Sequence, residues 1–229
     1  KKKNPELEIS EAVEPIIYYL DPGTPEPVKS ALLDGGRWWN QAYESIGFKD
    51  AFQVKMLPEG IDPLDCRYNV IQWVHRSTRG WSYGASVVDP RTGEIIKGHV
   101  SLGSLRIRQD YMIAQALTKD PFISNNQNNQ MLELAIARIR QLSAHEIGHT
   151  IGFAHNFAAS ANNRASVMDY PHPLVDLKDD EIVFDDVYDT GIGDWDKITV
   201  AYSYSHFKSN QNENDELNKI LEDATDNGL

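Results

Sequence analysis

The sequence contains a single cysteine, Cys66, among its 229 residues. A lone cysteine has no partner within the chain, so the fold cannot depend on an internal disulfide. Cys66 comes directly before the strand-like segment 68–74, inside the part of the sequence that we expect to fold. Free cysteines behave as small apolar residues and are usually buried. We therefore expect Cys66 to be a buried structural thiol.

Long apolar runs and an excess of positive charge are also missing. No stretch of about 18 apolar residues occurs, so we expect no transmembrane helix. The three lysines at positions 1–3 are followed by polar residues, so we expect no signal peptide and interpret the chain as part of a longer protein. The 34 acidic and 22 basic residues give a net charge of −12. This charge argues against nucleic acid or an anionic membrane as a partner.

What the sequence does contain is the pattern HExxHxxGxxH, which begins at His145 and ends at His155. His145 and His149 are four residues apart, so on a helix they lie one above the other on the same face. Glu146 lies about 100° around the helix from His145, close enough to reach a zinc-bound water without being a third ligand. This spacing predicts a zinc site with a carboxylate beside it.

The second half of the pattern predicts a third ligand. Gly152 can adopt the left-handed conformation that ends a helix. The chain would then turn back and bring His155 towards His145 and His149. Three neutral imidazoles leave the fourth tetrahedral position open for water, as in catalytic rather than structural zinc sites. We therefore expect one catalytic Zn²⁺ held by these three histidines.

The sequence after this pattern contains Met168 and, two residues later, Tyr170. With the long zinc motif before them, these residues resemble the metzincin clan of zinc endopeptidases, in which a tight turn carries a methionine. The resemblance implies that Met168 forms a hydrophobic floor beneath the histidines. It also implies that Tyr170 ligates the zinc or hydrogen-bonds the reacting carbonyl. Without this context, a lone methionine is usually core filling and a lone tyrosine usually packs its ring.

The resemblance is to the clan rather than to its better-known families, because Asn156 follows the third histidine. With the stretch 16–23 included, the sequence is most similar to large bacterial envelope proteins that contain a Met-zincin domain. This resemblance implies that the protein is exported, to the periplasm, the cell envelope or the extracellular space. The specific residues of this resemblance lie between 145 and 170. In the rest of the chain only the general order of the expected elements agrees with that of such proteins.

Hydrophobic patterns and turn residues predict the order of the elements. The expected strands are 16–20, 68–75, 85–88 and 94–108, the last with a break at Gly103-Ser104. The expected helices are 24–46, with Thr24 as its N-cap, then 131–151, which carries the zinc motif, and 194–207. A polar loop at 125–130 would precede the second of them.

These elements predict an α/β (α+β), metzincin-like fold with a twisted mixed sheet, the active-site helix and a backing helix. An upper, N-terminal subdomain at 12–152 would hold the sheet and the active-site helix. A smaller, loop-rich lower subdomain at 153–229 would hold the third histidine, the turn at 166–170 that carries Met168 (the Met turn) and a C-terminal helix. Together they would form one catalytic domain. The sheet is inferred from the resemblance and from the strand patterns.

Acidic residues are concentrated near the end of the chain. The segment 176–196 holds nine acidic side chains and one lysine. Carboxylates are the ligands that calcium prefers, but the spacing fits no known calcium loop. We therefore expect a solvated acidic surface there rather than a calcium site.

The resemblance also implies an edge strand above the zinc, to which an extended substrate would pair. The segment 96–103 is the best candidate, and its central residues would contact the substrate: Gly98, His99, Val100, Ser101 and Leu102. Pairing of a peptide with the edge of a sheet is a general mode of recognition. The alternative is an ordinary edge strand with no role in binding.

The predicted function is the hydrolysis of peptide bonds by a zinc-dependent endopeptidase acting on a protein or peptide. Zinc would activate its bound water and polarise the scissile carbonyl. Glu146 would accept the water proton and deliver it to the leaving amine, and Tyr170 would help to stabilise the oxyanion. One alternative is a zinc-holding domain that only binds a protein or glycan. Another is hydrolysis of a non-peptide amide, since this chemistry does not specify the acyl group.

Overall fold

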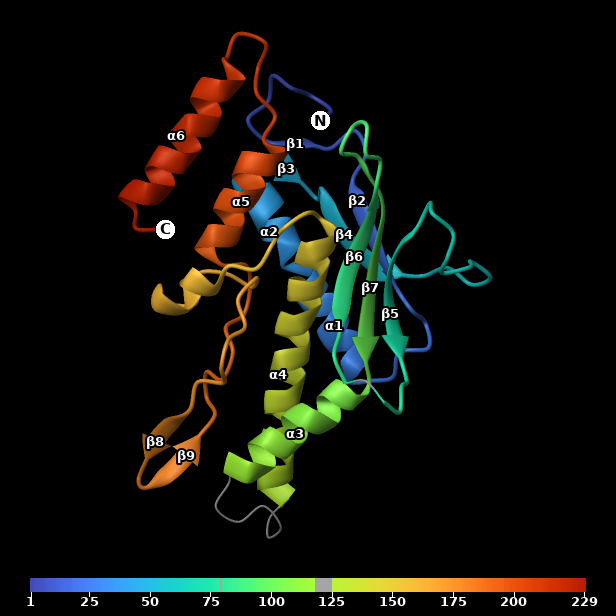
Figure 1. The fold of residues 1–229 in the computed structure, drawn as a ribbon, viewed down its shortest axis with the longest axis vertical. Coiled ribbons are helices and arrows are strands. Elements are labelled where there is room, and N and C mark those ends of the chain that lie inside the picture. The colour runs from blue at the N-terminus through green and yellow to red at the C-terminus, as the bar shows by residue number, and fades with distance from the viewer. Residues whose placement is uncertain (79, 118–124) are drawn as a thin grey trace.

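A five-stranded mixed sheet forms one layer of the fold, and the helix α4 (Asn125–Thr150) lies beside it (Figure 1). The computed structural model describes residues 1–78, 80–117 and 125–229. The strands lie in the order β4 (Phe52–Met56), β2 (Ile16–Leu20), β5 (Asn69–Val74), β7 (Ile95–Gly103) and β6 (Tyr83–Val88). The first four are parallel, and β6 pairs with β7 in the antiparallel sense. The predicted mixed α/β architecture is thereby confirmed.

The continuous apolar run of β2 lies inside the sheet. Tyr18 and Leu20 are almost completely buried, as expected for a parallel strand with neighbours on both sides. The Tyr18 hydroxyl also forms a 2.7 Å hydrogen bond with Thr150 Oγ1. This bond joins the middle of the sheet to the last turn of the helix that carries the zinc motif.

Three helices pack close to the sheet: α1 (Val28–Arg37), α2 (Trp39–Ser45) and α4 (Asn125–Thr150). The helices α1 and α4 touch so closely that a Cβ on Gly35 would overlap with the Arg140 carbonyl oxygen. Trp39 Nε1 donates to the Ala144 carbonyl at 2.8 Å, and Ser143 Oγ donates to the Leu32 carbonyl at 2.8 Å. These contacts fix the C-terminal half of α4, where the zinc motif lies.

The other elements lie around the sheet and these three helices. The helix α3 (Leu105–Leu117) packs on α4, α5 (Asp194–Tyr204) packs on α2, and α6 (Glu213–Asp226) packs on α5. Two small sheets pair β1 (Ser10–Glu11) with β3 (Phe48–Lys49) and β8 (Asp176–Lys178) with β9 (Glu181–Val183). The β8–β9 hairpin projects from the rest of the fold (Figure 1).

One hydrophobic cluster crosses the predicted boundary between the two subdomains. It includes Leu20 and Ile147 from the N-terminal side and Phe153, Met168 and Val200 from the C-terminal side. The Met turn and α5 are therefore packed into the same core as the sheet. The division at residues 152 and 153 stays a prediction.

The first helix and the long strand differ from their predicted bounds. The helix predicted at 24–46 begins at Val28 and is divided at Trp38 into α1 and α2. Thr24 does not cap it, because the residue at the N-cap position is Pro27. The Thr24 hydroxyl instead donates to the Asp21 carbonyl at 2.8 Å in the turn after β2. The strand predicted at 94–108 ends at Gly103, and α3 begins at Leu105. The break predicted at Gly103-Ser104 is thus the point where the chain passes from strand to helix.

The polar loop predicted at 125–130 is wrong, because α4 already begins at Asn125. These residues carry no apolar side chain, so hydrophobic periodicity cannot detect a helix there. A helix that is already formed by a packed segment extends at little cost in free energy.

The only cysteine of the sequence, Cys66, is exposed, so the prediction of a buried thiol is wrong. It lies in the loop between β4 and β5, next to Asp65 and Arg67, which form a salt bridge at 2.6 Å on the surface.

Within the described ranges, no helix has the length and apolar character needed to cross a bilayer.

Candidate metal centre

The last turns of α4 carry the first half of the zinc motif. Ala144 and Ile147 are completely buried against the core. His145 is 2% exposed and Glu146 is 5% exposed, whereas His149 is half-buried. The ring centroids of the two histidines are 4.8 Å apart, as a spacing of four residues on a helix predicts. The helix therefore presents both rings on one side, at the margin of the core.

A turn at the end of α4 reverses the chain. Gly152 has φ = +102°, which glycine adopts without steric strain. The Phe153 N–H donates to the Gly148 carbonyl at 3.0 Å, and the Gly152 N–H donates to the His149 carbonyl at 3.2 Å. These two bonds define a Schellman motif at the helix C-terminus. The chain then runs back and places His155 beside the helix.

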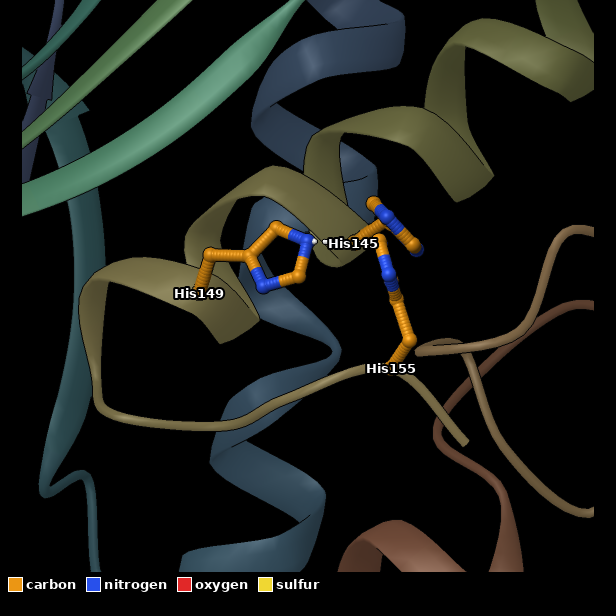
Figure 2. A group of neighbouring side chains, drawn as sticks. All are labelled: His145, His149 and His155. Atoms are coloured by element: carbon orange, nitrogen blue, oxygen red, sulfur yellow. Dashed lines mark hydrogen bonds between the residues drawn. The ribbon is translucent and has the colours of Figure 1, made fainter. Parts of the chain in front are cut away.

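Figure 2 shows the three histidines, with His145 and His149 on the helix and His155 on the loop that follows it. The Nε2 atoms of His149 and His155 are 3.1 Å apart, and one nitrogen of each of the three rings lies within 4.8 Å of the others. Two ligands of one tetrahedral zinc ion lie about 3.4 Å apart when each bond is about 2.0–2.1 Å long. The three-histidine group therefore fits a zinc ion.

In His145 and His149, a hydrogen bond to a backbone carbonyl determines which ring nitrogen faces the three-histidine group. His145 Nδ1 lies 2.8 Å from the Val167 carbonyl oxygen, and His149 Nδ1 lies 2.8 Å from the Phe153 carbonyl oxygen. Because a carbonyl oxygen only accepts, each Nδ1 must carry the hydrogen and donate. Each Nε2 then has the lone pair that binds a metal. Bonds of this kind fix the tautomer and the orientation of metal-binding histidines.

Burial favours the neutral form of these imidazoles. The pKa of His145 is lowered to about 3, mainly by burial and in part by the neighbouring His149, against the opposing effect of the Val167 carbonyl. Burial and His149 also lower the pKa of His155, whereas Asp169 raises it. A metal binds neutral imidazole. At neutral pH the rings of His145 and His155 are therefore ready to accept zinc.

Glu146 lies next to the histidines but is not one of the grouped ligands. Burial raises the pKa of Glu146 to about 7, and three groups oppose this effect: the Gly84 N–H that donates to the carboxylate, and the guanidinium groups of Arg138 and Arg106. A carboxyl group with a pKa near neutral is suited both to accept and to donate a proton. The structure thus places a carboxyl group with a near-neutral pKa beside the three histidines.

Met168 packs against the middle of the zinc motif. It is 2% exposed, and a Cβ on Gly148 would overlap with its sulfur and lie 2.8 Å from Trp39 Cζ2. Only a residue without a side chain allows this approach. The position agrees with the role of a floor beneath the histidines, which the metzincin resemblance implies for Met168.

We expect Gly148→Ala to lower the free energy of unfolding by about 1–3 kcal/mol, because overpacking displaces the neighbouring side chains. Denaturant unfolding measures this change. In a double-mutant cycle, the penalty of Gly148→Ala should be smaller when Met168 is replaced by Ala, since the two sites are in contact. Equal penalties in both backgrounds would show that the contact with Met168 is not the cause.

Tyr170 stands beside the histidines at the surface. Its ring centroid lies 4.5 Å from that of His155 and 5.3 Å from that of His145, and the residue is 55% exposed. Its backbone N–H donates to the Asp169 carboxylate at 2.7 Å, which fixes the chain after Met168. The structure brings Tyr170 to the metal centre, and its part in catalysis stays a prediction.

The prediction that 96–103 is an edge strand is wrong. β7 lies between β5 and β6, and its predicted substrate contacts are inside the sheet: Gly98, His99, Val100, Ser101 and Leu102. Val100 and Leu102 are completely buried. On this side of the sheet the edge strand is β6, because β7 pairs with β5 as well and so lies on the inner side of the hairpin. Residue patterns locate strands, but the order of the strands depends on contacts that are distant in sequence.

Sequence patterns did not reveal two further residues near the centre, Asp196 and Gly84. Asp196 belongs to the acidic segment that we expected to be solvated, yet it is 1% exposed. An acidic residue at the third position of a helix is a recognisable signal, but it does not indicate burial. Gly84, on β6, lies so close to α4 that a Cβ would overlap with the Glu146 carbonyl oxygen. No local signal predicts this contact.

Comparison with known proteins supports the family resemblance that was inferred from the sequence. Residues 127–229 match a protein family described as Met-zincin, which confirms the predicted resemblance to metzincin-type zinc metalloproteases. Among solved structures, the archaemetzincin from Methanopyrus kandleri is similar, with 18% identity and a TM-score of 0.30, over 69% of this chain and 82% of that chain. A comparison with curated proteins found no match.

Proposed function

From its Met-zincin region and its metal centre, we propose that this chain is a zinc-dependent endopeptidase. The observation that carries the proposal is Glu146, a buried carboxyl group that lies beside the three histidines and not among them. A structural zinc site is closed by four protein ligands, so it has no use for such a group. A zinc ion held by the three histidines supplies Lewis-acid activation of water and of a carbonyl group.

The residues of the chain supply the proton transfers and the charge stabilisation. The Glu146 carboxylate accepts a proton from the attacking water and donates it to the leaving nitrogen. The water oxygen bonds to the carbonyl carbon and the C–N bond breaks, which leaves a carboxylic acid and an amine. The carboxylic acid then loses its remaining proton to solvent. Tyr170, whose ring lies beside that of His155, would donate its hydroxyl hydrogen to the developing oxyanion.

We assign the substrate-pairing role to β6 instead of to the segment 98–102. β6 is one of the two edge strands, and it packs on the end of α4, where a Cβ on Gly84 would lie 3.2 Å from His149 Cβ. An extended peptide can add to such an edge as a further strand. A main chain bound there would run directly past Glu146 and His149. β6 thus gives an extended substrate a fixed register with respect to the reacting groups.

Gly84→Ala should lower kcat/KM by about 100-fold, because a displacement of roughly 1 Å in substrate position has an effect of this size. The new Cβ would push β6 away from the Glu146 carbonyl. Zinc content should not change. Ser86→Ala, two residues along the same strand, is the matched control and should keep wild-type kinetics. Similar kcat/KM values for Gly84→Ala and the control would exclude β6 as the strand that positions substrate.

Metal removal and reconstitution test the proposed function. We expect one zinc ion per chain by elemental analysis, cleavage of a mixture of fluorogenic peptides, loss of cleavage after treatment with a chelator, and recovery when zinc is added back. Cleavage that persists in zinc-free protein would contradict the proposal. Tight zinc binding without cleavage of any peptide would favour a zinc-holding binding domain.

The proposal includes export of the protein to the periplasm, the cell envelope or the extracellular space. Its support is the sequence resemblance to bacterial envelope proteins that contain a Met-zincin domain. Fractionation of the producing cells with a specific antibody tests this part, and recovery of the protein in the cytoplasm alone would contradict it.

A further inference from the structure

A buried carboxylate on α5 is linked to the metal centre through the Met turn. Asp196 Oδ1 accepts a hydrogen bond from the Ser166 hydroxyl at 2.6 Å. Its Oδ2 accepts the N–H groups of Val167 at 2.8 Å and of Gly193 at 2.9 Å. The Gly193 bond lies at the start of α5, where the Asp196 carboxylate at the third helical position accepts the N–H of the N-cap residue. The other two bonds reach into the Met turn, so one carboxylate joins this turn to the start of the helix.

The Ser166 hydroxyl continues the series of hydrogen bonds towards the histidines. Its oxygen accepts the Met168 N–H at 3.0 Å. The same peptide unit includes the Val167 carbonyl, which accepts the His145 Nδ1–H at 2.8 Å and the Gln141 Nε2–H at 3.0 Å. A chain of hydrogen bonds therefore runs from the His145 ring to the Asp196 carboxylate, through the Val167–Met168 peptide and the Ser166 hydroxyl. Each group in this chain donates to the next.

Capping of α5 does not by itself explain this arrangement. A capping side chain needs only to satisfy free N–H groups at the start of a helix. Asp196 is moreover only 1% exposed, and burial of a charged group is unfavourable unless hydrogen bonds compensate for the lost water. Burial raises the pKa of Asp196 to about 6, so the carboxylate is mainly charged at neutral pH.

We propose that Asp196 is a positioning residue for His145, acting through Ser166 and the Val167–Met168 peptide. Metal-binding histidines commonly donate their second N–H to a carboxylate or a carbonyl, which fixes the ring and raises the basicity of the metal-binding nitrogen. In this protein a carbonyl contacts the ring, and the carboxylate polarises that carbonyl, since hydrogen bonds in series strengthen one another. The inference deepens the proposed function and rests on zinc binding by the three histidines.

Zinc affinity of the whole chain, measured by competition with a chromophoric chelator, tests the proposal. The variants are Asp196→Asn, which removes the charge, and Ser166→Ala, which interrupts the chain but leaves the bonds from Asp196 to Val167 and Gly193. Asp194→Asn is the matched control, because Asp194 lies in the same helical turn with its side chain 72% exposed. All measurements are made where circular dichroism shows that the protein is folded.

We expect Asp196→Asn and Ser166→Ala each to weaken zinc binding by about 10-fold, the lower end of the effect of removing outer partners of a metal ligand. Asp194→Asn should bind zinc as the wild type does. A lower melting temperature with unchanged zinc affinity in both variants would overturn the proposal, because Asp196 would then act on stability alone. If Asp196→Asn does not fold, Ser166→Ala decides the question.

The same measurements separate this inference from the proposed function. Wild-type protein that holds zinc but cleaves no peptide would contradict the peptidase activity, while the variants would still support or overturn the link to His145. Wild-type protein that does not bind zinc would overturn both.

Discussion

Glu146→Gln is expected to lower kcat by about 10²–10⁴-fold, the contribution typical of a positioned general acid–base group. The amide has nearly the same shape as the carboxyl group but cannot accept the water proton. The zinc content and the melting temperature should stay close to those of the wild type, since Glu146 is outside the ligand group. Steady-state cleavage of a fluorogenic peptide, together with elemental analysis of the same sample, provides the measurement.

Glu133→Gln is the matched control for this variant. Glu133 lies on the same helix, α4, and is exposed, so its replacement should leave kcat unchanged. If Glu146→Gln and the wild type behave alike towards every substrate, and both hold one partner tightly, the chain is a zinc-holding binding domain. In that case the carboxyl group beside the histidines has no role in proton transfer.

Tyr170→Phe should lower kcat by about 100- to 1,000-fold, the effect typical of removing one oxyanion donor. This prediction rests on the position of the Tyr170 ring. Its centroid lies 4.5 Å from that of the His155 ring and 5.3 Å from that of the His145 ring. The substitution removes one hydroxyl from an exposed ring and keeps the ring contacts. Folding, zinc content and KM should therefore hardly change. Kinetics on a single peptide substrate, with separate kcat and KM, measures the effect.

Tyr202→Phe provides the control for the loss of a hydroxyl. Tyr202 is 45% exposed on α5, and its substitution should have no effect on kcat. A Tyr170→Phe variant with nearly full kcat would reduce Tyr170 to a residue that packs against the histidines.

The three-histidine group could be predicted because its geometry is encoded locally. A spacing of four residues on a helix, followed by a glycine with positive φ, determines where His145, His149 and His155 lie. The interactions involved span only a few residues, including the bonds from Gly152 and Phe153 back to the helix. Such an arrangement depends little on the rest of the fold, so the pattern of residues was sufficient.

The surroundings of the ligands could not be predicted, because they depend on contacts between distant parts of the chain. The burial of Asp196 follows from its contact with Ser166, 30 residues earlier. The identity of the edge strand follows from the way β7 inserts between β5 and β6, and alternation of residues is the same in an edge strand and its neighbour. The helical residues 125–130 were missed because a polar segment has no periodicity to detect.

Mass spectrometry of a mixed peptide library after incubation with the zinc-loaded chain tests the central claim most directly. We predict new termini at internal peptide bonds, at sites that recur among library members, and we predict that these products are absent when Glu146→Gln protein is used. An intact library at every pH tried, with zinc bound to the folded wild-type chain, would contradict the assignment of this site as that of an endopeptidase.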